Sequence, residues 1–126
     1  GKGDFLAFLS AVRRDVQLSL ADIATQAVAH AAELGFQSRV IDLEEEVLAK
    51  KTKCITLTFA AHLLSSKALE SVYASLDRDG IFIFNIYPPG QNEVNFYSNL
   101  IRKIGFSQVQ VEYADNRIDP ILIARK

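Results

Sequence analysis

Few residues of this chain have the types and positions expected of catalytic or ligand-binding residues. Most of these few follow predicted strands. His62 comes shortly after the apolar segment Cys54–Phe59, where an imidazole could act as a base. Asp42 ends a short apolar strand, the position at which an acidic residue holds a ribose hydroxyl in nucleotide-binding sheets. Arg13 and Arg14 precede a predicted helix and could together clamp an anion. Each of the four also has a plainer explanation as a cap, a turn residue or part of a solvated loop.

Other catalytic and metal-binding patterns are absent from the sequence. It has no Gly-x-Ser-x-Gly elbow, no Gly-x-x-x-x-Gly-Lys phosphate loop and no His pair at ligand spacing. The segment Asp77–Gly80 resembles the start of a calcium loop, but Pro88 stands where the bidentate Glu should be. Cys54 is the single cysteine, which excludes a multi-cysteine zinc or iron–sulfur site within this chain, and we predict an inert core thiol. We therefore predict no metal site and no cofactor in this chain.

The composition narrows the class of protein. The 126 residues carry 14 Lys and Arg against 15 Asp and Glu, and this net charge of -1 gives no electrostatic footprint for nucleic acid. No apolar stretch approaches the roughly 18 residues that cross a bilayer, and the apolar opening is too short for a signal peptide. We expect a cytoplasmic, monomeric protein with one domain over residues 1–126. Because the chain has no methionine at all, we also expect it to be a piece of a longer protein.

Hydrophobic periodicity predicts alternating strands and helices. Asp4–Ala11 is apolar on both faces, as a strand buried in a parallel sheet is. Apolar residues at three- and four-residue spacing predict one helix from Leu20 to Leu34, begun by a capping box of Ser19 and Asp22 and ended by Gly35. The other predicted strands are Val40–Ile41, Cys54–Phe59 and Ile81–Ile86, and helical turns are predicted over Glu44–Ala49. Two further helices are predicted, one capped by Ser65 or Ser66 and one capped by Asn92 and ended by Gly105. The chain closes with a predicted hairpin of Val109–Tyr113 and Ile121–Ala124, with its turn at Asp115 and Asn116.

This order predicts the α/β class, with a three-layer, Rossmann-like, mostly parallel sheet that has helices on both faces and a C-terminal antiparallel β-hairpin. A cofactor-binding version needs glycines just after its first strand, because only they let the backbone touch the ligand. The segment after Asp4–Ala11 has none before Gly35. We therefore expect the loop from Ser10 to Ser19 to have lost the cofactor site, with Val12 and Val16 closing the surface.

The second half of the chain resembles the carboxyl-terminal half of a class I S-adenosylmethionine-dependent methyltransferase. The resemblance covers roughly the last 70 residues and rests on the order of their segments. Its leader departs from the family's Leu-x-Pro-Gly-Gly, since the proline and one glycine are missing from Leu76–Gly80. The segments that carry it are the helix end Ala74–Gly80, the strand Ile81–Ile86, the helix end Arg102–Phe106, the strand Val109–Val111 and the closing Leu122–Lys126.

Its short length and missing glycine loop make the whole chain similar in layout to the amino-terminal domain of anamorsin proteins, which belong to the cytosolic iron–sulfur assembly machinery. That resemblance implies a non-catalytic interaction domain that docks a diflavin reductase or another assembly protein. It places iron–sulfur clusters only in a cysteine-rich segment outside these 126 residues.

Two other hypotheses stay open at this point. A divergent methyltransferase, or a fragment of one, would use Asp42 for the ribose and His62 or Asn85 near its substrate. A small anion- or nucleotide-binding regulatory domain would be built around Arg13 and Arg14. The loop from Ser10 to Ser19 separates the three: it would be filled with side chains in the docking domain, expose its backbone in the enzyme, and expose the arginine pair in the regulatory domain.

Overall fold

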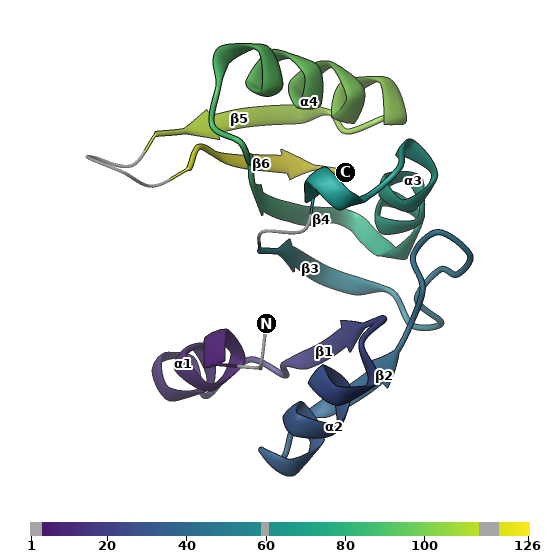
Figure 1. The fold of residues 1–126 in the computed structure, drawn as a ribbon, viewed down its shortest axis with the longest axis vertical. Coiled ribbons are helices and arrows are strands. Elements are labelled where there is room, and N and C mark those ends of the chain that lie inside the picture. Colours follow the sequence, from purple (N-terminus) through teal and green to yellow (C-terminus); the bar gives the residue numbers. More distant parts are fainter. Residues whose placement is uncertain (1–3, 59–60, 114–118) are drawn as a thin grey trace. The chain divides into compact units, whose positions relative to one another are not determined.

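A computed structural model describes residues 4–58, 61–113 and 119–126. The chain forms two compact units, Gly1–Asp42 and Leu43–Lys126 (Figure 1). The single domain over residues 1–126 stays a prediction. The elements in chain order are α1 (Asp4–Val12), β1 (Ser19–Asp22), α2 (Thr25–Glu33), β2 (Gln37–Val40), β3 (Thr52–Leu57), the 3-10 turn η1 (Ala61–Leu63), α3 (Ser66–Ser75), β4 (Leu76–Asn85), α4 (Gln91–Ile104), β5 (Gln108–Glu112) and β6 (Ile121–Arg125).

The first unit corrects two sequence predictions. Asp4–Ala11 is not a buried strand but most of helix α1, which buries none of its residues. A short apolar run cannot be assigned by periodicity alone, and this one is rich in the helix formers Leu and Ala. The predicted helix from Leu20 is also shorter, because Ser19–Asp22 forms strand β1 and α2 begins only at Thr25.

The capping box of Ser19 and Asp22 is therefore wrong. Ser19 opens β1, and the N-cap of α2 is Ala24, whose side chain makes no capping bond. Instead Asp22 Oδ1 accepts a hydrogen bond from the backbone N–H of Ala24 at 2.9 Å. The carboxylate thus supports the turn that leads from β1 into α2.

The predicted helix stops at Gly35 and Gly105 are confirmed. Their φ angles are 86° and 127°, in the left-handed region that glycine adopts without strain. After each glycine a backbone N–H turns back to the helix: Phe36 N donates to Ala31 O at 3.0 Å, and Phe106 N donates to Ile101 O at 3.3 Å. This is the bond pattern of a Schellman ending.

The second unit contains a four-stranded sheet in the order β3-β4-β6-β5 (Figure 1). Strands β3 and β4 are parallel, whereas β4–β6 and β5–β6 are antiparallel. The predicted hairpin of the last two strands is confirmed, and β5 lies at the sheet edge. Its predicted turn at Asp115 and Asn116 falls outside the described residues.

The core of this unit lies between the sheet and helices α3 and α4. Phe82 and Phe84 of β4 and Leu122 of β6 project to this face and are fully buried. Leu69 of α3 and Ile101 of α4 meet them there. Both helices therefore cover the same face of the sheet.

The prediction of one mostly parallel sheet with helices on both faces was right in class but wrong in detail. The structure has an α/β arrangement whose parallel pairs, β1–β2 and β3–β4, belong to two separate sheets. The larger sheet is mixed because β6 enters it antiparallel to β4. Residue patterns gave the alternation of elements, but they contain no direct signal for which strands become neighbours.

Three local predictions in this unit were also wrong. Glu44–Ala49 forms turns and irregular chain rather than helix. The N-cap of α4 is Gly90, not Asn92. Asp79 and Gly80 do not separate a helix from a strand but lie within β4, where the register shifts and Asp79 has a φ of 62°. In the part of the chain that the structure describes, no helix has the length and apolarity to span a membrane.

Candidate functional site

Two carboxylates lie at the carboxyl edge of the β1–β2 pair, within the first unit. Asp22 is the last residue of β1 and pairs in register with Val40, the last residue of β2. The backbone hydrogen bonding between β1 and β2 continues one residue beyond the strands, since Ile41 N donates to Asp22 O at 3.1 Å. Asp42 follows directly, so Asp22 and Asp42 extend from the same edge. Carboxyl ends of parallel strands are where open α/β sheets bind their ligands.

Asp22 is the residue that the sequence analysis missed. It was placed inside a helix, so the ribose role was given to Asp42 instead. With α1 recognised as a helix, the pattern becomes Gly1-Lys2-Gly3, a helix, and then a strand that ends at Asp22, about 20 residues after the glycines. That spacing was the sequence signal that could have identified Asp22 as the candidate ribose-binding carboxylate. Asp22 is half-buried, and its Oδ1 is already bonded to Ala24 N.

The arginine pair lies elsewhere than predicted. Arg13 and Arg14 follow the end of α1 instead of preceding a helix. The Arg13 guanidinium binds Asp15 through two bonds, Nε to Oδ1 at 2.9 Å and Nη2 to Oδ2 at 2.8 Å. These bonds lower the pKa of Asp15 to about 2, and Arg13 thereby has its charge matched by a neighbouring carboxylate.

The loop that was expected to close the cofactor cleft is not filled by side chains. Val12 is 57% exposed and Val16 is 43% exposed. Both residues lie at or beyond the end of α1 instead of after a buried strand. The expected collapse of a former cleft around them is therefore wrong.

His62 and Asn85 lie at the carboxyl end of the parallel pair β3–β4, in the second unit. His62 belongs to η1, is exposed, and its ring centroid lies 5.5 Å from that of Tyr87 with the planes tilted by 58°. Asn85 ends β4, and its Nδ2 donates to Asp119 Oδ2 at 3.4 Å. Tyr87 is 48% exposed. This edge thus presents an imidazole, a phenol, an amide and a carboxylate.

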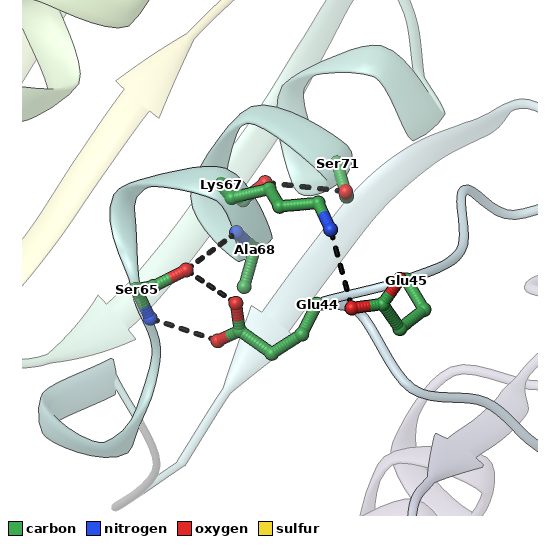
Figure 2. Close-up of polar contacts among 6 residues, drawn as sticks. All are labelled: Glu44, Glu45, Ser65, Lys67, Ala68 and Ser71. Carbon is green, nitrogen blue, oxygen red and sulfur yellow. Dashed lines mark hydrogen bonds and ion pairs between the residues drawn. The ribbon is translucent and has the colours of Figure 1, made fainter.

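The acidic residues Glu44 and Glu45, which precede β3, have a structural role. Glu44 accepts hydrogen bonds from the backbone N–H of Ser65 at 2.9 Å and from its hydroxyl, and Ser65 Oγ accepts from Ala68 N at 3.3 Å (Figure 2). Glu45 forms an ion pair with Lys67 at 3.2 Å. The sequence predicted Ser65 or Ser66 as the cap of this helix, and Ser65 is the N-cap. These contacts hold the segment after the first unit to the start of α3.

Cys54 is not the buried core thiol that the sequence predicted. The residue is exposed, on a strand whose inward positions are Ile55 and Leu57. Partial burial still raises the pKa of the Cys54 thiol. Among the described residues, no group of three or more His, Cys, Asp or Glu side chains is placed to hold a metal ion.

One open hollow of the second unit lies away from these groups. It has a volume of about 540 Å³, opens widely to solvent, and is lined by Lys53 and residues 77–81. These residues stand near the amino ends of β3 and β4. Because open α/β sheets bind ligands at the opposite end, we assign the hollow no role.

Comparison with solved structures identifies the fold. PigF with SAH superimposes on the whole chain with a TM-score of 0.83 at 15% identity, and the chain covers 48% of it. The fold is methyltransferase-like. A TehB-like SAM-dependent methyltransferase from Corynebacterium glutamicum aligns with a TM-score of 0.76 at 14% identity, over 100% of this chain and 76% of its own.

Human N-acetylserotonin methyltransferase in complex with SAM gives a TM-score of 0.79 at 16% identity, over 100% of this chain and 45% of its own. The chain thus spans about half the length of two of these three proteins. No protein-family model matches the sequence, and no curated protein matches it either. At these identities the comparisons establish the fold and leave activity to the residues.

Proposed function

We propose that this chain belongs to an S-adenosylmethionine-dependent methyltransferase and that its first unit binds the nucleoside part of the cofactor. The observation that carries the proposal is the position of Asp22 at the carboxyl end of β1, the parallel strand that follows α1. A carboxylate at that point accepts hydrogen bonds from ribose hydroxyls in nucleotide-binding sheets. When bound, S-adenosylmethionine supplies an electrophilic methyl group.

The residues of this edge fit such a ligand. The bond from Ala24 N fixes the Asp22 side chain through Oδ1. A carboxylate has several acceptor sites, so one bond to the backbone leaves it able to accept from a hydroxyl. Asp42 adds a second carboxylate to the same edge.

The residues that precede α1 in the sequence also support the proposal. Gly1 and Gly3 stand immediately before the helix, and glycines at such a position allow close approach of a ligand to the backbone. Asp4–Ala11 belongs to helix α1 and is not the first strand. A glycine-containing cofactor segment is therefore expected before this segment in the sequence and not after it.

The hypothesis of a non-catalytic docking domain of the anamorsin type, with a diflavin reductase or an iron–sulfur assembly protein as partner, stays a prediction. Its support is the order of the elements and the exposed apolar side chains of the second unit, such as Leu63, Phe96 and Tyr113. The clusters and the cytoplasmic location that it implies are equally untested. The two hypotheses differ in a direct way, because only the first requires S-adenosylmethionine to bind.

Titration calorimetry of this chain with S-adenosylmethionine and S-adenosylhomocysteine tests the proposal. Asp22→Asn keeps an oxygen that can accept from Ala24 N but removes the charge. We expect it to weaken binding by roughly 10- to 100-fold, the value of a charge-assisted hydrogen bond of about 1.5–3 kcal/mol. Glu33→Gln is the matched control in the same unit, since Glu33 lies on α2 beside His30. Absence of binding to the unmodified chain would favour the docking domain, and equal binding by Asp22→Asn would remove the role of Asp22.

A further inference from the structure

We propose that strand β5 pairs with the same strand of a second copy of this chain and thereby joins two four-stranded sheets into one. In the described part of the chain, β6 is the one strand that neighbours β5, so β5 stands at the edge of its sheet (Figure 1). The backbone N–H and C=O groups along a sheet edge can pair with a strand of another chain. This inference does not depend on the proposed function.

Strand β5 lacks the features with which proteins usually protect an edge strand. Its register with β6 is regular over all five residues, so no β-bulge interrupts it. Lysine and proline, which discourage pairing at an edge, do not occur in its sequence. Glu112 is its single charged residue. The strand is therefore regular and nearly uncharged along its whole length, as a strand that accepts a partner should be.

The opposite edge of the same sheet, β3, has the protection that β5 lacks. The register of β3 with β4 shifts between Thr52 and Cys54. Lys53 lies within the strand, and Lys50 and Lys51 directly precede it. Irregular pairing and lysines both oppose association with another chain. This contrast within one sheet favours β5 as the edge that associates.

The sequence of β5 is complementary to itself in an antiparallel pair. A two-fold axis at Gln110 places Gln108 opposite Glu112 of the second copy, and Val109 opposite Val111 of the second copy. Gln110 then lies opposite the same residue. This is the one antiparallel register that pairs all five residues of both strands, and no like charges meet in it. The two sides of a closed dimer are the same surface, so an interface of this kind requires such self-complementarity.

The side chains of this pairing also match on each face of the sheet. Val109 and Val111 are half-buried against the core of the second unit, so a second copy would extend that apolar surface. Gln108, Gln110 and Glu112 are exposed, and the Gln110 amide donates to the Glu112 carboxylate of the same strand. A five-residue edge is small beside the roughly 1,200 Å² or more that stable interfaces bury. We therefore expect a weak dimer whose population depends on concentration.

Sedimentation equilibrium of the whole chain tests the association, at concentrations from about 10 μM to about 1 mM, the range of weak dissociation constants. We expect the average mass to rise from that of the monomer toward that of the dimer. It should rise no further, because two-fold pairing uses the β5 edge of both copies. A monomer mass at every concentration, or growth beyond the dimer, would overturn the proposal.

Two lysine substitutions on the same face of β5 test the register. Gln110→Lys sets two ammonium groups opposite each other at the two-fold axis, and we expect the dissociation constant to rise at least about fivefold. Gln108→Lys makes the same chemical change two residues away but sets the lysine opposite Glu112 of the second copy. The dimer should then form as well as before or more tightly. Both side chains are exposed, so neither change should disturb the fold. Equal effects of the two substitutions would contradict the proposed pairing.

Cysteine cross-linking measures the register directly, in a Cys54→Ser background that removes the single native thiol. Gln110→Cys places two Cα atoms about 5 Å apart across the two-fold axis, within the span of a disulfide. Gln108→Cys leaves them about 14 Å apart, four residues along the strand and beyond that span. Mild oxidation should therefore cross-link the Gln110→Cys chain several-fold faster. Equal cross-linking by the two variants, or none by Gln110→Cys, would rule the pairing out.

Discussion

The carboxylate of Glu44 accepts hydrogen bonds from both the backbone N–H and the hydroxyl of Ser65, the N-cap of α3. In a capping box the carboxylate that returns to the N-cap N–H belongs to the third helical residue. Here that residue is Ala68, which has none, and Glu44 supplies the group from 21 positions earlier in the chain. The start of α3 is therefore fixed by the segment that precedes β3.

Glu44→Gln is expected to lower the melting temperature at neutral pH. The hydrogen bonds from Ser65, the hydroxyl first and the backbone N–H second, lower the pKa of Glu44 in the folded chain. A lowered folded pKa stabilises the fold above the unfolded value of about 4.3, and this contribution is lost as the pH falls through the folded pKa. Thermal melts of both proteins from pH 7 to pH 3 should therefore converge at the acid end.

Glu70→Gln is the control for this prediction, because it removes one negative charge from an exposed position of the same helix. We expect its melting temperature to stay within about 3 °C of the unmodified value at every pH, since exposed substitutions away from such contacts change stability by about 0.5 kcal/mol or less. A loss in Glu44→Gln that persists unchanged at pH 3 would contradict the capping role.

Lys126→Met is expected to destabilise the second unit. Lys126 Nζ donates to Tyr73 O at 2.8 Å and to Leu76 O at 3.0 Å, and it lies 4.5 Å from the centre of the Tyr73 ring. These carbonyls belong to the end of α3 and its C-cap, where a cation is favourable. Urea unfolding should show a loss of about 1–3 kcal/mol, since Met keeps the apolar stem but not the charged donor.

Lys103→Met is the comparison for this substitution. Lys103 is exposed in the last turn of α4, so the same chemical change removes a charge near a helix end without those two hydrogen bonds. Its cost should be a few tenths of a kcal/mol. Equal losses in the two variants would mean that the carbonyl contacts of Lys126 contribute nothing.

The alternation of strands and helices in the second unit could be predicted from sequence because its signals are local. Ser65 caps α3, Gly105 ends α4, and the apolar run at Ile81–Ile86 lies within β4. Each depends on side chains within a few residues of one another. The capping contact of Glu44 could not be predicted, because it joins residues 21 positions apart.

The first unit was harder to predict for a physical reason. Asp4–Ala11 is apolar all round and short, a pattern shared by buried strands and by helices. With that segment assigned as the first strand, β1 was missed and its residues were included in the following helix, which hid Asp22. The candidate residue Asp42 was still placed after a strand, but the better-positioned carboxylate was missed.

Arg13→Gln is expected to raise the pKa of Asp15. The two bonds from the Arg13 guanidinium hold that pKa at about 2 in the unmodified chain. Without them the pKa of the Asp15 carboxyl should rise toward its ordinary value of about 3.9, although a backbone hydrogen bond still lowers it. Carbon-detected NMR of the Asp15 carboxyl during an acid titration measures both values. Arg14→Gln, which removes the neighbouring charge, should leave the Asp15 midpoint in place, and an equal rise in both variants would mean that net charge rather than the specific pair sets it.

Cys54 is expected to react slowly with thiol reagents although the residue is exposed. The thiolate is the nucleophile, and partial burial raises the pKa of the Cys54 thiol, so the reactive fraction at neutral pH falls below that of a free cysteine. Its rate with 5,5'-dithiobis(2-nitrobenzoic acid) at pH 7 should be lower than that of glutathione and should rise steadily to pH 9. Urea that unfolds the chain should restore the ordinary rate, because the burial is then lost. A rate above that of glutathione in the folded chain would show an activating environment that the contacts of β3 do not provide.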